Sequence, residues 1–226
     1  MKTLDRVLLW VLLPAIIVGL YFAFIYAPTE KVMGTVQRIF YFHVASAWTA
    51  LLSFFFVFVG GVLYLWKKDV RYDHFSYAAT ELGVLFSSIV LVTGPIWAKP
   101  VWNVWWTWDP RLTSTFILWL IYVAYLLFRS SLRDNPAIRT YSAIYGIIGF
   151  ADVPIVWMSI HWWRTIHPRV ITIKAIQLES TMWTAVLVCW FAIMLLYVTL
   201  LRIRMTLEKT REQVESVQQT ILEANV

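Results

Sequence analysis

The chain has 226 residues, of which 60% are hydrophobic and 14% are charged, and its formal net charge is +6. A water-soluble domain carries about a quarter charged residues, so this composition excludes an ordinary globular domain and indicates a protein built from membrane spans. The basic residues lie between the apolar runs, where they set topology. We therefore do not interpret the positive charge as a nucleic-acid-binding surface.

The single cysteine, Cys189, lies inside the last apolar run. One cysteine excludes a disulfide within the chain and a Cys-x-x-Cys redox pair, and the Cys-x-x-Cys-His motif for covalent haem attachment is absent as well. Thiol chemistry is therefore not expected to carry the function.

The first apolar segment, residues 7–26, follows the basic residues Lys2 and Arg6. Its apolar stretch of about 20 residues is longer than the 7–15 residues of a signal-peptide core, and no small-residue cleavage site closes it. We predict a retained first span.

Five further apolar segments follow, each long enough to cross a hydrocarbon core of ~30 Å. Continuous apolar runs favour helices over the alternating strands of a membrane barrel. The sequence therefore predicts an all-α polytopic membrane protein with six transmembrane helices, near residues 7–26, 39–66, 77–98, 112–128, 140–160 and 182–201.

We divide the chain into a transmembrane domain, residues 1–206, and a polar C-terminal tail, residues 207–226. The tail has Leu207, Val214 and Ile221 seven residues apart. Because this is barely two heptads, a short solvated helix is expected rather than a coiled coil.

Orientation follows from the distribution of lysine and arginine. With the N-terminus in the cytoplasm, twelve of these residues lie on the cytoplasmic side and seven on the external side. Positive charge favours the cytoplasmic side, so we predict an N-in, C-in topology. The loop between the third and fourth spans is then external.

That external loop, residues 97–113, contains four closely spaced tryptophans. If the stretch is helical, one face carries residues at i, i+3, i+4 and i+7. Such a stripe fits an interfacial tryptophan belt, and it fits equally well a flat wall for a planar macrocycle. The four tryptophans are Trp102, Trp105, Trp106 and Trp108, and Asp109 shares the face of the first three.

Asp109 and Pro110 have the order expected at the start of a helix, with Asp as the N-cap and Pro at the first helical position. Arg111 lies in the first turn, where the helix dipole and free N–H groups favour an anion. A carboxylate such as a haem propionate would be held there by the arginine. Capping alone also explains Asp109.

Three of the four histidines, His43, His161 and His167, are expected on the external side, whereas His74 lies in a basic cytoplasmic loop. Two histidines from different helices could ligate a haem iron from opposite faces. A zinc site would need further ligands, and a structural role remains open. Asp152, inside the fifth span, stays unassigned.

The stretch VWNVWWTWDPRLTS closely resembles the WWD signature of haem-handling proteins in cytochrome c maturation, and the six-span layout resembles the haem exporter protein C (CcmC) family. RIFYFHVASAW and VPIVWMSIHWWRTIHP occur in the same order as in that family. The resemblance covers the chain up to about residue 200. Asn103 departs from the motif, in which glycine is expected, and this departure puts the local turn in doubt.

In that family two external histidines flank the WWD loop and serve as axial haem ligands. The matching residues are His43 and His167, and His161 is a weaker match. The resemblance thus implies non-covalent haem b as the cofactor. The residues expected to bind it are His43 and His167 at the iron, with Trp102, Trp105, Trp106, Trp108, Asp109 and Arg111 around it.

The resemblance implies a non-enzymatic protein of the bacterial cytoplasmic (inner) membrane that presents haem at the periplasmic side to the chaperone CcmE. The implied partners are CcmE, the ABC-type subunits CcmA and CcmB, and the small membrane protein CcmD. ATP would be used by a partner, because the chain has no Gly-x-x-x-x-Gly-Lys-[Ser/Thr] loop. A haem b electron-carrier subunit and a cofactor-free structural subunit of a transporter stay open as alternatives.

Overall fold

The structure is a computed structural model and describes residues 3–133, 135–167 and 178–224. Apart from one isolated bridge between Glu30 and Gly34, these residues form helices, turns and loops, which confirms the all-α prediction. The elements are α1 (Thr3–Tyr21), a π-helical turn η1 (Phe22–Tyr26), a 3-10 turn η2 (Thr35–Gln37), α2 (Arg38–Lys67), α3 (Val70–Trp102), α4 (Pro110–Ser131), α5 (Ile138–Gly149), α6 (Asp152–Trp162) and α7 (Ser180–Ala224).

Six helical segments are long and apolar enough to cross a membrane. This agrees with the predicted number of spans. The helices extend beyond the apolar runs; α3, for example, begins at Val70 rather than near residue 77. Hydropathy marks only the apolar part of a helix, whereas the backbone hydrogen bonds continue into polar flanks.

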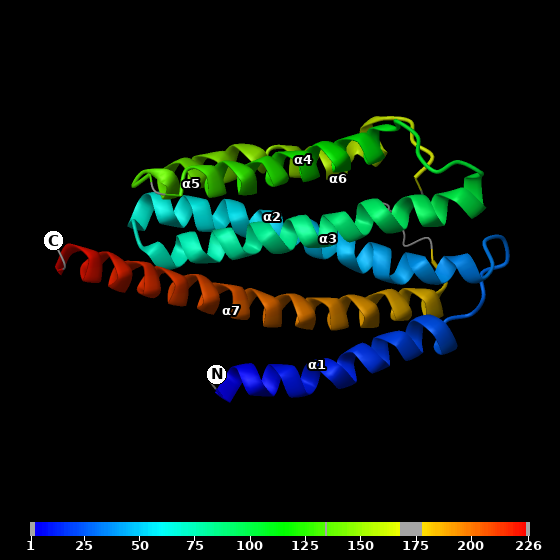
Figure 1. Cartoon of the computed structure of the whole chain (residues 1–226). Helices are drawn as coiled ribbons and strands as arrows, with labels where there is room; N and C mark the ends of the chain where they lie inside the picture. Colours follow the sequence, from blue (N-terminus) through cyan, green and yellow to red (C-terminus); the bar gives the residue numbers. More distant parts are fainter. Residues whose placement is uncertain (1–2, 134, 168–177, 225–226) are drawn as a thin grey trace.

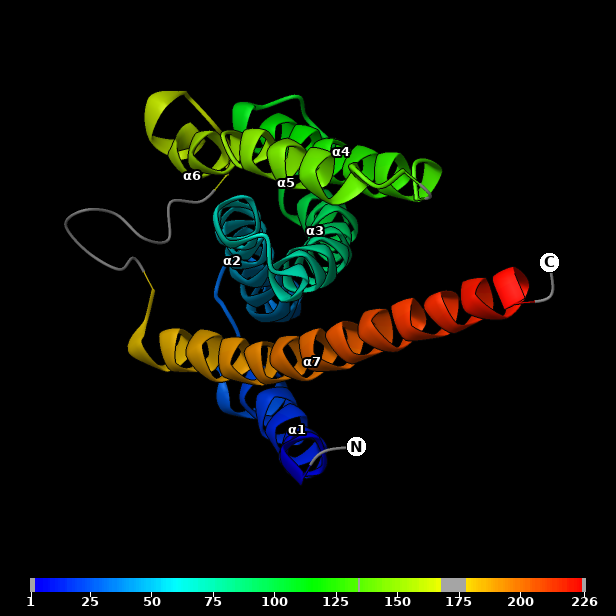
Figure 2. The same cartoon turned by 90° about the vertical axis from the view of Figure 1, so that its left-hand side faces the viewer.

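The helices form three layers (Figure 1). α2 and α3 pack against each other in the middle, α4, α5 and α6 cover one side, and α7 covers the other, with α1 packed on the outer side of α7; the same stacking is seen from the end in Figure 2. The α1–α2 connection, the α3–α4 loop and the end of α6 lie at one end of the bundle. We call this end the tryptophan end.

The fifth span is broken into α5 and α6 at Phe150 and Ala151. Pro154 lies in the first turn of α6 and has no N–H to donate to the carbonyl of Phe150, so an unbroken helix is disfavoured at this point. α6 packs mainly on α4, and only slightly on α2. The break therefore gives the tryptophan end a short helix of its own.

The end of α3 depends on Asn103, which has φ 59° and ψ 17° and lies in the left-handed region. Its backbone N–H donates to the carbonyl of Lys99, and the ammonium of Lys99 donates to both oxygens of Asn103. Glycine is the usual residue here, and asparagine is the main alternative. The departure from the motif therefore preserves the turn.

The middle of the bundle is closed by an aromatic stack. The rings of Phe54 and Tyr122 lie parallel with centroids 4.0 Å apart, and both side chains are fully buried. Gly83 makes this approach possible, because a Cβ there would lie 2.5 Å from the Phe54 ring. α2, α3 and α4 are thus held together at this level.

The opposite end of the bundle is ionic. Arg129 donates two hydrogen bonds of 2.6 Å to Asp73, and Arg139 bonds to Glu212 of α7. α7 continues without a break through the region in which the sequence predicted a separate tail helix. The tail is helical, as expected, but it extends the last span.

Candidate functional site

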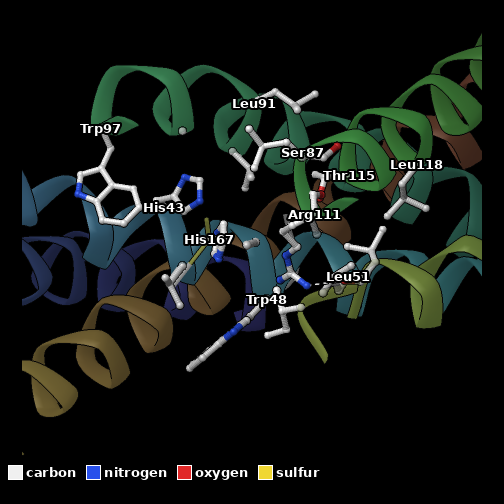
Figure 3. A pocket seen from close by; sticks show the side chains of 18 of the residues that line it. His43, Trp48, Leu51, Ser87, Leu91, Trp97, Arg111, Thr115, Leu118 and His167 are labelled. Carbon is white, nitrogen blue, oxygen red and sulfur yellow. Dashed lines mark hydrogen bonds between the residues drawn. The ribbon is translucent and has the colours of Figure 1, made fainter. Parts of the chain in front are cut away.

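A large cavity lies between α2, α3, α4 and α6 at the tryptophan end (Figure 3). Along α2 its walls run from Phe40 to Phe54, a rise of about 21 Å at ~1.5 Å per residue. The Phe54–Tyr122 stack closes it at depth, and most of its walls are apolar or aromatic. The polar side chains that reach it include His43, His161, His167 and Arg111.

His43 is contributed by the second turn of α2 and is 8% exposed. Its Nδ1 lies 2.9 Å from the hydroxyl oxygen of Thr93 on α3. The neighbouring Gly94 leaves room for the ring, since a Cβ there would lie 3.5 Å from its Cε1 atom. α2 and α3 together therefore fix this imidazole.

His167 reaches the same cavity from the segment that follows α6. Its backbone N–H donates to the hydroxyl of Thr165 at 3.0 Å. The Thr165 hydroxyl donates in turn to Asp109 Oδ2 at 2.5 Å, and the N–H of Ile166 donates to the same oxygen at 3.3 Å. The segment that carries His167 is thus tied to the α3–α4 loop.

Arg111 lies in the first turn of α4 and lines the cavity. One guanidinium N–H donates to the carbonyl of Val156 on α6. Within the part of the chain that the structure describes, no carboxylate lies within ion-pair distance of it. A partly buried cation in an apolar cavity is a suitable partner for an anionic group of a ligand.

His43 and His167 both lie on the same side of the cavity as Arg111. His167 and Arg111 are close enough to His43 to interact with it electrostatically, and Figure 3 shows the three side chains directed into the same space. The two histidines that the sequence pairs are therefore brought together, from elements more than a hundred residues apart.

The four tryptophans divide into two pairs. Trp102 and Trp106 line the cavity, whereas Trp105 and Trp108 are exposed, by 59% and 72%. α3 ends at Trp102 and the loop is not helical up to Asp109, so the single helical stripe considered from the sequence does not form. The exposed Trp108 ring still packs edge-on against Trp106, with centroids 5.6 Å apart.

Two indole N–H groups beside the cavity have no acceptor among the described residues. These are Nε1 of Trp97, on α3, and Nε1 of Trp106, in the loop. A buried donor without a partner is costly, and native structures leave few of them. Both could be satisfied by the polar edge of a bound ligand.

Asp109 is the N-cap of α4, where its Oδ1 accepts from the N–H of Leu112 at 3.0 Å, as the sequence predicted. It is absent from the cavity walls, and its second oxygen holds Thr165. His161 lines the cavity at the last turn of α6, with an exposed side chain. Asp152 begins α6 outside the cavity and remains unassigned.

Comparison with known proteins decides the family. The family model described as "Heme exporter protein C" matches residues 1–220. The chain belongs to this family.

Individual members show the same relation. The chain is 37% identical over 149 residues to a putative cytochrome c biosynthesis ccmC-like mitochondrial protein of Marchantia polymorpha. The aligned region covers 66% of this chain and 63% of that protein. It is 34% identical over 158 residues to the Arabidopsis thaliana protein with the same description, covering 70% and 59%. The Heme exporter protein C of Escherichia coli K12 is 31% identical over 163 residues, covering 70% and 66%. The match thus spans about three fifths to two thirds of these relatives.

The site also contains residues that the sequence alone did not indicate. Thr93 and Thr165 hold the two histidines, and Trp97 offers a free indole N–H at the cavity wall. Thr93 precedes Gly94 in the third span, but nothing in its own helix indicates a partner on α2. Contacts between helices carry this information, and local sequence periodicity does not.

The side chains that line the cavity limit the ligands it could hold. Among the described residues, no three histidine, cysteine or acidic side chains converge as a set of metal ligands. Two imidazoles, aromatic walls and one arginine fit a metal that arrives within a planar, largely apolar macrocycle bearing carboxylates.

Proposed function

We propose that this protein binds haem b non-covalently in the tryptophan-end cavity and presents it for transfer during c-type cytochrome maturation. The observation that carries the proposal is the convergence of His43 and His167 on one apolar cavity. Neutral imidazoles on opposite sides of a porphyrin give a six-coordinate iron. Membership of the Heme exporter protein C family supports the same cargo.

The remaining polar groups fit the rest of the cargo. Arg111 is positioned to bind a propionate, with its fork of N–H donors suited to a carboxylate. The free indole N–H groups of Trp97 and Trp106 provide further donors. Trp102 and Trp106 supply the aromatic wall. The protein positions and releases haem, so we assign it no enzymatic step.

Membership of the family also supports a proposal for the setting. We place the tryptophan end at the periplasmic face of the bacterial inner membrane, with the N- and C-termini in the cytoplasm, in accord with the lysine and arginine distribution. The acceptor is the chaperone CcmE. CcmA and CcmB supply ATP hydrolysis, and CcmD completes the complex.

The test is the absorption spectrum of the purified full chain after addition of hemin, for wild type, His43→Ala and His167→Ala, with a pyridine haemochrome to measure how much haem is bound. Each variant should lose the low-spin six-coordinate spectrum, because one axial ligand is missing. His74→Ala is the control, since His74 lies beside Glu212 at the ionic end. Wild-type spectra in both His43→Ala and His167→Ala would refute the axial assignment.

The same preparation separates the alternatives. A haem-transfer protein should give its haem to apomyoglobin, a haem acceptor, whereas an electron carrier should retain it while a quinol reduces it. A wild-type protein with no Soret band after hemin addition would favour the cofactor-free structural subunit.

A further inference from the structure

The contact between His43 and Thr93 determines which ring nitrogen carries the proton. The Thr93 oxygen is 2.9 Å from His43 Nδ1, 2.7 Å from the carbonyl oxygen of Ile89 and 3.5 Å from that of Val90. A hydroxyl has one proton and two lone pairs, whereas a carbonyl oxygen only accepts. The short contact to Ile89 therefore uses the hydroxyl proton.

The Thr93 oxygen is then left as an acceptor toward His43. Donation from a helical threonine to the carbonyl four residues earlier is a common local bond. For the 2.9 Å contact to be a hydrogen bond as well, Nδ1 of His43 must carry the hydrogen. The lone pair is then on Nε2, the nitrogen on the other side of the ring.

We propose that Thr93 is a positioning residue that holds His43 in the Nδ1–H tautomer, so that Nε2 is the atom that binds the haem iron. The inference rests on the proposed function and identifies the chain's own group that prepares the ligand. A second hydrogen bond of this kind orients most metal-binding histidines.

The surroundings of Thr93 fit this role. Thr93 is absent from the cavity walls and lies behind the His43 ring, while Gly94 packs beside Cε1. Two successive residues of α3 thus fix the tilt and the tautomer of one imidazole. Because a hydroxyl is neutral, it orients the ring without giving it anionic character, which suits haem that must be released.

The first test compares Thr93→Val with Thr93→Ser in the full chain loaded with hemin. The valine variant loses the acceptor but keeps the branched shape, so we expect a partly high-spin spectrum and about 10-fold to 100-fold faster haem loss to apomyoglobin. The serine variant keeps the hydroxyl and should match wild type. If valine matches wild type, or serine is as defective as valine, the proposal is wrong.

A matched control is available in α2. Thr49 is fully buried, and its hydroxyl donates to the carbonyl four residues earlier at 2.8 Å, but among the described residues it has no hydrogen bond to a histidine. Thr49→Val should leave the haem spectrum and the rate of haem loss unchanged. An equal defect in Thr49→Val would attribute the effect to helix packing and contradict the proposal.

The second test needs no change at Thr93 and no bound haem. Nitrogen-15 NMR of histidine-labelled wild-type protein, compared with His43→Gln to assign the signal, distinguishes a protonated from an unprotonated Nδ1. We expect the Nδ1–H form, and the Nε2–H form would overturn the proposal even if Thr93→Val does not fold. Because this measurement uses haem-free protein, failure of haem binding itself would be seen separately, in the hemin titration.

Discussion

The two histidines of the site are held in different ways. His43 lies within a 30-residue helix and is fixed through its ring by Thr93 of a second helix. His167 lies beyond the end of α6 and is fixed through its backbone by Thr165, which in turn depends on Asp109. One histidine belongs to the core of the bundle, and the other belongs to a segment that is tied to the start of α4.

This difference indicates which contacts support each histidine. His43 lies between α2 and α3, which make the most extensive helix–helix contact among the described residues, and its ring is held by Thr93. The backbone segment that carries His167 is tied to Asp109 through Thr165 and Ile166. For the proposed haem site, we therefore expect the support of His167 to depend on Asp109 and that of His43 on the packing of α2 against α3.

The largest effect on hemin affinity should follow from removing the hydrogen bonds of Asp109 to Thr165 and Ile166. Asp109→Ala removes both bonds to the 165–166 segment and an N-cap that contributes about 1 kcal/mol. Because His167 loses its support, we expect about 10-fold to 100-fold weaker hemin binding. The measurement is a Soret titration, with a thermal melt of the same sample.

Asp69 supplies the control for that experiment. It caps α3, accepts a hydrogen bond from the N–H of Arg71 and lies at the ionic end, away from the cavity. Asp69→Ala should cost similar stability but leave hemin affinity unchanged. If both variants weaken hemin equally, Asp109 acts as a cap alone and the comparison between the two histidines loses its support.

A smaller effect is expected at Arg111. Arg111→Lys keeps the positive charge but loses the paired N–H donors of the guanidinium. The loss of one charged hydrogen bond, about 1.5 kcal/mol, should weaken hemin affinity roughly tenfold. The dimethyl ester of hemin, which has no free carboxylates, should bind wild type and variant alike. An equal loss with the ester would show that Arg111 serves the α4–α6 contact through Val156 instead.

The smallest effect separates the two pairs of tryptophans. Trp106→Leu removes an aromatic wall of the cavity and should weaken hemin binding about 3-fold to 10-fold. Trp105→Leu, in the same loop, at a side chain that is 59% exposed and absent from the cavity walls, should change affinity by less than about 2-fold. The reverse order, measured by the same titration, would place the cargo on the outer surface of the loop.

Much of the fold could be predicted from hydropathy because each span is a continuous apolar run. The cap of α4 was also predictable, since Asp109 and Pro110 act on their own helix. The conformation of residues 103–109 was not predictable, because the left-handed Asn103 ends α3 before the tryptophans can form one helical face. Local rules succeeded where the controlling contacts are local.

The site was predictable in its residue types and only partly in its geometry. His43, His167, Trp102, Trp106 and Arg111 were expected together, and all line one cavity. Their hydroxyl partners were missed, because Thr93 and Thr165 matter only through residues far away in the sequence. The exposure of Trp105 and Trp108 likewise depends on the path of the loop and not on its composition.

Asn103 has a consequence for how relatives are recognised. The position is defined by a positive φ and by the bonds to Lys99, so what it must preserve is a backbone shape rather than a particular letter. Glycine and asparagine meet that condition, whereas a β-branched residue would be strained there. A search pattern written with glycine alone would overlook chains that make the same turn with a different residue.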